Sequence, residues 1–404
     1  MRHPQSRFDA TTEHLLDTAD RLVIESGLRE LSLESVSNTG YASTGSVYER
    51  WRSKWQLIDE LTDQRFERHW SRLVDGSEHL PLSDRLQRFE ESADGHLAGT
   101  WLVEALHLAR VRPDFLPRTH ALIDRLAQWL TVDDESTDSP TAIGCSQWLV
   151  ANIIGVHQLR IGGADMPPMS SAMATLVAPP QADRRPTPAD TSIDRIPGLS
   201  PLPPPGSDPY DIDDVSRHIV GVTRTLLASA AGELSVRSIL GHSNVSSTTL
   251  YRRFESKRQL LLQVLNGELS SASYEWVIEL VDSLGTDDPI GAMARVFRRR
   301  FDTLTAYPDT RNVILELTAQ ARNDADLRRT LISQVERMAE LRSELFERMR
   351  LAKVLTGSLS PEVAGWLVQA PATGYRLLVG AGIPIDPDHM ESATARVFWN
   401  LLGD

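Results

Sequence analysis

Cysteine is almost absent from this chain, since Cys145 is the only one among 404 residues. A single thiol excludes an internal disulfide and a cysteine-based zinc site, because both need several sulfur atoms. The surrounding sequence IGCSQWLV is mostly apolar, which favours a small buried residue over a reactive thiol. We therefore expect no disulfide framework, no metal and no other cofactor.

Long apolar runs are lacking too, and no stretch approaches the roughly 18 residues that a membrane span requires. The N-terminal residues MRHPQSRFDATTEHLL contain no apolar segment of the kind that secretion signals carry. A composition of 41% hydrophobic and 24% charged residues is typical of globular proteins. We expect a cytoplasmic protein that does not contact a membrane.

Motifs of common catalytic sites are also missing. The 11 histidines include no H-x-x-x-H or H-E-x-x-H pair, and neither G-x-S-x-G, a P-loop nor a dinucleotide-binding glycine pattern occurs. We expect no enzymatic activity. The net charge of −13 opposes non-specific binding to polyanions, so a nucleic-acid role would need a local basic face.

The chain does contain an internal repeat. YERWRSK at 48–54 returns as YRRFESK at 251–257, and ELS at 30–32 returns at 233–235, both with a shift of 203 positions. Further along, the WLV that begins at Trp148 recurs at Trp366 with a shift of 218, which indicates insertions in the second copy. A chain of this length suits two domains of roughly 200 residues each. We infer a tandem duplication.

The two copies are separated by residues 178–210, which contain ten prolines and almost no apolar periodicity. Proline denies this segment helical hydrogen bonds and favours extended conformations, so we interpret it as a linker. The predicted division of the chain is head 1 (1–62), body 1 (63–177), the linker (178–210), head 2 (211–265) and body 2 (266–404).

Apolar residues recur at helical spacing nearly everywhere outside the linker, and no hairpin signal interrupts them, which predicts an all-α protein. In each head a first helix is followed by two short helices and then a fourth helix. The first helix of head 1 should stop at Gly27. Serines able to accept hydrogen bonds from first-turn amides mark the short helices, namely Ser32, Ser43, Ser235 and Ser246.

The break between the short helices is tight in both copies, with TGYAS in one and HSNVS in the other. Gly40 or Asn244 could adopt the positive φ that such a turn needs. Two short helices joined in this way form a helix-turn-helix. The fourth helix opens with S-x-x-Q, a capping-box pattern, at Ser53 and Ser256.

These features resemble the TetR family of bacterial transcriptional regulators. The resemblance rests on STGSVYERWRSKWQL at 43–57 and SSTTLYRRFESKRQL at 246–260, and it covers about fifty residues in each copy. It implies tandem protomers, each with a three-helix DNA-binding head and a helical body that binds a small-molecule effector and dimerises. Because one chain holds two heads, we expect an intrachain pseudo-dimer on double-stranded DNA, with repression as the more common outcome. Whether two chains associate further stays open.

The DNA-reading residues implied by the resemblance lie on the second short helix of each head and at the start of the next helix. The tyrosines and lysines are expected at phosphates, although core packing or plain solvation are the alternatives, and the threonines, serines and Arg252 at base edges. Val47, Trp51, Leu250 and Phe254 are assigned to packing. The full set is Ser43, Thr44, Gly45, Ser46, Tyr48, Arg50, Lys54, Ser246, Ser247, Thr248, Thr249, Tyr251, Arg252 and Lys257.

The two heads differ in charge. Residues 11–62 hold 5 basic and 9 acidic side chains, a net charge of −4, whereas residues 211–262 hold 7 and 5, a net charge of +2. Head 2 therefore has the better electrostatic basis for phosphate contact, and the two half-sites should differ. The alternative hypothesis is a ligand-sensing or protein-interaction module in which one or both heads have lost DNA binding.

Effector-pocket candidates are the aromatic and polar residues within the apolar helices of the bodies, although aromatic residues at helical spacing also build ordinary cores. These candidates are Trp101, His107, Trp148, Asn152, His157, Trp366, Tyr375 and Arg376.

Overall fold

The computed structural model describes residues 4–77, 79–131, 139–179, 213–229, 234–284, 286–351 and 359–402, without the side chains of 4–7, 267–278, 281 and 284. Every regular element in these ranges is a helix, so the prediction of an all-α protein is confirmed for the described part of the chain. The linker predicted at 178–210 lies outside the described residues from residue 180 onward.

The N-terminal half folds as a head followed by a body of longer helices. Its helices are α1 (Pro4–Ser26), α2 (Leu33–Thr39), α3 (Thr44–Arg50), α4 (Lys54–Leu61), the π-helix η1 (Thr62–Phe66), α5 (Glu67–Val74), α6 (Leu82–Glu91), α7 (Ala93–Val111), the 3-10 turn η2 (Pro113–Phe115), α8 (Leu116–Trp129), α9 (Pro140–Gly162) and α10 (Ser170–Val177).

The C-terminal half has the same order of a head and then a body. Its helices are α11 (Asp214–Ala228), α12 (Val236–Ser243), α13 (Ser247–Arg253), α14 (Lys257–Leu284), α15 (Pro289–Ala306), α16 (Pro308–Ala321), α17 (Ala325–Leu351), α18 (Pro361–Ala381) and α19 (Pro387–Leu402).

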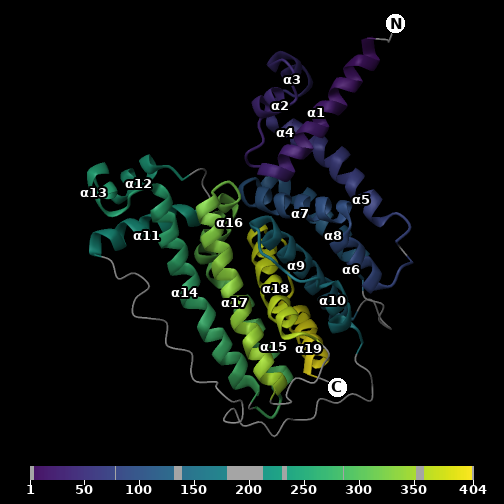
Figure 1. The fold of residues 1–404 in the computed structure, drawn as a ribbon, viewed down its shortest axis with the longest axis vertical. Helices are drawn as coiled ribbons and strands as arrows, with labels where there is room; N and C mark the ends of the chain where they lie inside the picture. Colours follow the sequence, from purple (N-terminus) through teal and green to yellow (C-terminus); the bar gives the residue numbers. More distant parts are fainter. Residues whose placement is uncertain are drawn as a thin grey trace.

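Figure 1 shows how these helices are arranged. The helices α9 and α18 lie in the middle of the molecule, and α17 packs beside α18. Head 1 is at the top and head 2 is at the left, so α3 and α13 both lie on the outside, away from the central pair.

Each head continues into its body through helical backbone. The predicted boundary at 62/63 falls inside η1, between α4 and α5, and the one at 265/266 falls inside α14. No loop therefore separates either head from its body within the described residues.

The helices α9 and α18 approach so closely that glycine is required on both. A Cβ on Gly155 would lie 1.8 Å from the carbonyl oxygen of Ala370, and a Cβ on Gly374 would lie 1.8 Å from that of Ala151. The contact is reciprocal: Gly374 is equivalent to Gly155, and Ala370 is equivalent to Ala151, both by a shift of 219 positions.

This shift corrects the alignment of the WLV motifs. Trp148 and Trp366 are 218 positions apart, whereas the reciprocal contact has a shift of 219, which also relates the left-handed C-caps Gly163 and Gly382. One residue turns an α-helix by about 100°. The two tryptophans consequently face different surroundings, although their sequence contexts look alike.

The buried apolar side chains form two cores. One runs through head 1 and both bodies without interruption, from Leu15 to Leu402. The other joins head 2 to the facing parts of α16 and α17, through residues such as Val313 and Leu331. The two bodies are thus one packed unit, because their apolar faces are buried against each other.

Candidate nucleic-acid interface and effector cavity

The short helices of both heads begin at the serines that the sequence marks. Ser32 and Ser235 accept the amide hydrogens of residues 35 and 238, whose own serine side chains accept the cap amides in return. Ser43 and Ser246 cap α3 and α13 at 3.2 and 3.1 Å. Their hydroxyls therefore accept backbone amide hydrogens in the first turn of these helices, which would otherwise have no partner. The caps also fix the direction in which each helix leaves the preceding loop.

The turn itself differs from the prediction in head 1. Tyr41 has the positive φ of 51°, while Gly40 has an ordinary φ of −84°. Gly40 is needed for space instead, because a Cβ there would lie 2.8 Å from both a Leu15 methyl carbon and the Val36 carbonyl oxygen. In head 2 the prediction is confirmed, since Asn244 has φ 52° at the position equivalent to Tyr41.

The capping box predicted at the next helix forms only in half. Ser53 accepts the amide of Gln56, but the Gln56 side chain accepts from the Arg52 amide at 2.9 Å and not from Ser53. Head 2 repeats this arrangement with Gln259 and the Glu255 amide at 2.6 Å. The longer glutamine side chain reaches one residue further back than the cap.

One face of α3 and of α13 is buried and the opposite face is open to solvent. Val47, Trp51, Leu250 and Phe254 are at most 5% exposed and pack within the heads. Tyr48 and Tyr251 are 51% and 50% exposed. The other exposed residues of the predicted reading set are Ser43, Thr44, Gly45, Ser246, Ser247, Thr248 and Arg252, whereas Ser46 and Thr249 are half-buried.

Two of the predicted phosphate contacts of head 1 are engaged within the chain. The Arg50 guanidinium donates to the Thr12 hydroxyl at 2.8 Å and to the Ser46 carbonyl at 2.7 Å, so it ties α3 to α1. The Lys54 ammonium donates to the Arg29 carbonyl at 2.6 Å, and burial lowers the pKa of Lys54. Arg50 and Lys54 thus make structural contacts within head 1, and their role at DNA stays a prediction. Lys257 is half-buried at the start of α14.

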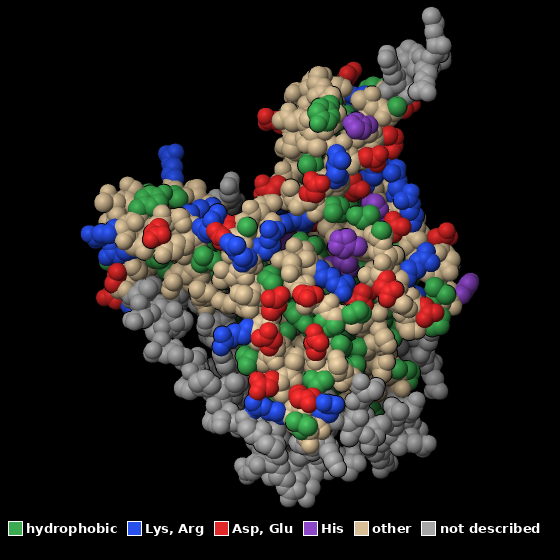
Figure 2. All heavy atoms as spheres, viewed as in Figure 1, with side chains coloured by type: hydrophobic (Ala, Val, Ile, Leu, Met, Phe, Trp, Pro, Cys, Tyr) green, Lys and Arg blue, Asp and Glu red, His purple; other side chains and the backbone are tan. Residues whose placement is uncertain are grey.

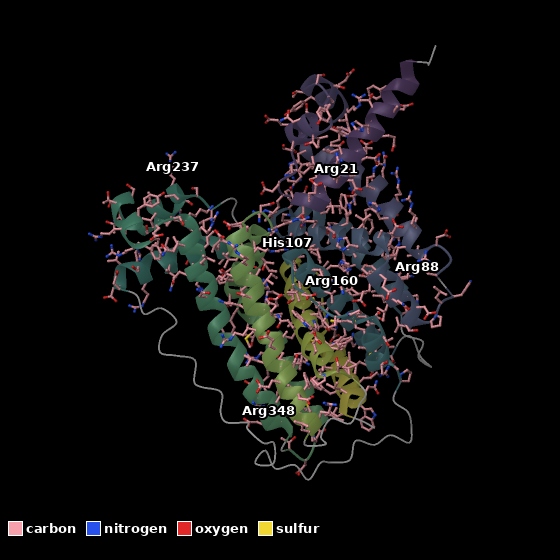
Figure 3. The ribbon with its side chains drawn as sticks, in the orientation of Figure 1. Arg21, Arg88, His107, Arg160, Arg237 and Arg348 are labelled. Carbon is pink, nitrogen blue, oxygen red and sulfur yellow. The ribbon has the colours of Figure 1, made fainter. Side chains whose placement is uncertain are left out.

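The open surfaces of the two heads carry opposite charges at two equivalent positions. Head 1 exposes Glu34 and Glu49, where head 2 exposes Arg237 and Arg252. Figure 2 shows basic side chains over head 2 and acidic side chains around head 1, and Figure 3 shows Arg237 pointing away from its head. Electrostatic attraction to a polyanion is consequently stronger for head 2.

A cavity of about 620 Å³ lies in body 2, between α15, α16, α17 and α18, with one wall supplied by α9 of body 1. Three of the predicted effector residues line it, namely Trp148, Tyr375 and Arg376. Its volume is within the range of small-molecule sites, which is roughly 300–1,000 Å³.

The other predicted effector residues lie elsewhere in the core. Trp101 donates to Asp20 at 2.8 Å, and His107 bonds Gln158 at 2.8 Å. Asn152 donates to the Trp148 carbonyl at 2.9 Å. Each of these side chains thus has a partner in the core, although the Asn152 Oδ1 is buried without one. His157 packs against Phe89, and Trp366 is buried outside the cavity lining.

Apart from Arg376, the sequence prediction missed the arginines of the cavity. Its lining contains six arginines and, among the described residues, no aspartate or glutamate. No sequence motif groups these residues, because they come from four helices and one connection. They are Arg300, Arg311, Arg322, Arg337, Arg342 and Arg376.

Arg322 connects the cavity to head 1. Its guanidinium donates to the Glu104 carboxylate and to the carbonyls of Val23 and Ile24, at 2.8 and 2.5 Å, in the last turn of α1. Glu104 also accepts the Leu28 amide at 2.7 Å, just after α1 ends. Burial raises the pKa of Glu104, and the charge of Arg322 opposes that effect.

A second ion pair joins body 2 directly to head 1. Arg29, in the loop after α1, contacts Glu316 on α16 at 2.9 Å, and Glu316 is only 3% exposed. Body 2 is therefore attached to the N-terminal half by two ion pairs with buried carboxylates, one to Glu104 on α7 of body 1 and one to Arg29 of head 1. Removing one partner of such a pair is costly, because the other charge stays buried.

Comparisons with models of known protein families and with curated proteins find no match to this chain. Among the described residues no helix combines the length and apolarity that crossing a bilayer demands, and no cluster of three or more potential metal ligands occurs.

Proposed function

We propose that this chain is a DNA-binding transcriptional regulator of the TetR type, most simply a repressor, that carries two unlike heads. The observation that carries this proposal is the helix-turn-helix geometry repeated in both heads, with serine caps at equivalent positions and an exposed tyrosine on each second helix. The open face of α13 presents Ser247, Thr248 and Arg252, which are side chains that can bond base edges in a major groove.

The two halves act as an intrachain pseudo-dimer in this proposal. Support comes from the reciprocal contact of α9 and α18 and from the core that both bodies share. Reciprocal contacts of this kind are the property of a twofold interface between like subunits. One chain then covers two half-sites about one helical turn of DNA apart, and the half-sites differ because the reading residues differ.

An effector acts through the cavity in body 2. A ligand changes DNA affinity only if it binds the two head arrangements with different affinity. Arg322 supplies a physical route for such a difference, because it lines the cavity and also holds the last turn of α1. A ligand that draws Arg322 into the cavity loosens this attachment of head 1.

A second function is favoured by one observation, the acidic open surface of head 1. Glu34 and Glu49 face solvent where phosphate would approach, which suits a head that binds a protein or serves only as part of a ligand sensor. Salt dependence separates the two functions, since neutralising phosphates makes affinity fall steeply as salt rises.

The test is selection of genomic DNA fragments by the purified protein, followed by salt titrations on a retained fragment. We expect Lys257→Ala to weaken binding to all fragments alike and to reduce the salt slope by about one unit. Thr248→Ala should change sequence preference instead, and the exposed Thr225→Ala on α11 is the control. Retention of no fragment with salt-sensitive affinity would favour the second function.

A further inference from the structure

The cavity in body 2 combines an apolar wall with buried groups that carry positive charge. Phe297, Phe301 and Ile314 contribute apolar surface. Within the described part of the chain, two nitrogens of Arg300 (Nε and Nη2) and the Nε of Arg376 are buried without a hydrogen-bond partner. The Tyr375 hydroxyl in the same lining is likewise buried and unpaired.

Burial makes the charges of these guanidiniums costly. Burial lowers the pKa of Arg376 to about 10, and burial together with the nearby Arg376 lowers the pKa of Arg342 to about 10. Both guanidiniums stay charged at neutral pH. A buried charge such as that of Arg376 is normally compensated by an opposite charge, yet the described part of the lining contains no carboxylate.

We propose that the cavity binds an organic anion, with a carboxylate or phosphate head group at Arg300 and Arg376 and an apolar body against Phe297, Phe301 and Ile314. Guanidinium groups fit both head groups with paired N–H donors. The anion supplies the charge that the lining lacks, and the aromatic wall excludes water from its apolar part. A cation of the same shape is repelled by the same residues.

One ligand binds per chain. The interior of body 1 is filled with aromatic rings, in which Trp70 lies 6.0 Å from both Phe66 and Trp129, and Phe89 lies 5.2 Å from His157. The cavity also takes one wall from α9 of body 1, so it needs both halves of the chain. An effector role for the anion rests on the proposed function, whereas its binding does not.

The experiment is calorimetric titration of the full chain with decanoate, decyl phosphate, decanol and decyltrimethylammonium. We expect one site per chain for an anion, with at least tenfold weaker binding of the alcohol and the cation. The stronger of the two anions identifies the head group. Equal binding of the cation and the anions, or no binding of either anion, overturns the inference.

Arg376→Gln tests the assigned residue. It should weaken anion binding at least tenfold while leaving the thermal midpoint unchanged or higher, because a buried charge is removed. Arg300→Gln is the second variant and gives the same loss of affinity if Arg376→Gln does not fold. Arg299→Gln, an exposed position outside the lining, is the control. Unchanged anion affinity in Arg300→Gln and in a folded Arg376→Gln overturns the assignment.

DNA binding measured with and without the bound anion separates the two proposals. An anion that binds without changing the affinity for any retained DNA fragment contradicts its role as effector and leaves the site assignment intact. If the chain retains DNA but binds neither anion, the anion-site inference fails and the proposed function stands.

Discussion

Replacement of Gly155 by alanine probes the contact on which the arrangement of the two halves depends. The new Cβ would lie 1.8 Å from the Ala370 carbonyl oxygen, and ordinary contact begins at 3.4 Å. The helices α9 and α18 must therefore move apart locally by about 1.6 Å, the difference between these two distances. No side-chain rotation relieves the clash, because the obstructing atom belongs to the backbone.

The expected change in stability follows from two opposing contributions. Alanine in place of glycine stabilises a helix interior by about 1 kcal/mol. Overpacking a core costs about 1–3 kcal/mol, and a clash with backbone belongs at or above the upper end of that range. We expect Gly155→Ala to lower the free energy of unfolding by about 2 kcal/mol. The assay is chemical denaturation followed by circular dichroism.

Gly221→Ala is the matched control. Gly221 lies inside α11, and a Cβ there meets no atom within 4 Å. The same substitution should raise the stability of head 2 by about 1 kcal/mol. The reasoning fails if Gly155→Ala stabilises the protein as Gly221→Ala does.

The reciprocal contact adds a stricter requirement. Gly374→Ala should cost about as much as Gly155→Ala, because each Cβ meets a carbonyl oxygen at the same distance. One separation of α9 from α18 relieves both clashes, so the double variant should cost less than the sum of the single variants. Strict additivity would contradict a shared contact.

Two further predictions concern charge. Glu49→Arg on α3 copies the charge that Arg252 has in head 2, and it should raise DNA affinity and steepen its salt dependence by about one unit, measured by fluorescence anisotropy; an unchanged slope would mean that head 1 does not approach phosphate. Burial lowers the pKa of His157 to about 3 from the ordinary 6.5, so the unfolded chain binds this proton first as pH falls. The stabilising contribution of a neutral His157 is complete above pH 6.5. The free energy of unfolding then decreases by about 1.4 kcal/mol per pH unit as the pH falls from 6.5 towards 3. Urea denaturation across this range should show a pH dependence of stability that is shallower by about one proton in His157→Gln than in the wild type; an unchanged slope would contradict a neutral buried His157.

The heads were the most predictable part of the structure. Serine caps, the stop at Gly27 and the left-handed Asn244 depend on neighbours within about four residues, so the sequence contains all that decides them. The error at Gly40 has a cause outside this short range. Gly40 was expected to supply the positive φ, but its missing Cβ makes room for Leu15 on another helix, and Tyr41 takes the left-handed conformation.

The effector candidates were predicted less well, because aromatic residues on apolar helices were considered without knowledge of which faces meet. Trp148 and Trp366 share a motif, yet only Trp148 lines the cavity, since the structural shift of 219 differs by one residue from the motif shift. Of the six cavity arginines the sequence indicated only Arg376, and nothing in it grouped the six together. Arg300 and Arg376 are 76 positions apart and lie in different helices.

The sequence by itself determined the helical class, the repeated heads and the residues on their open faces, because helix periodicity and capping are short-range properties. Tertiary structure alone decided the close contact of α9 with α18, the place of the cavity and the attachment of head 1 through Arg322 and Glu104. These features join residues far apart in the chain, and they depend on how whole helices rotate and pack against each other.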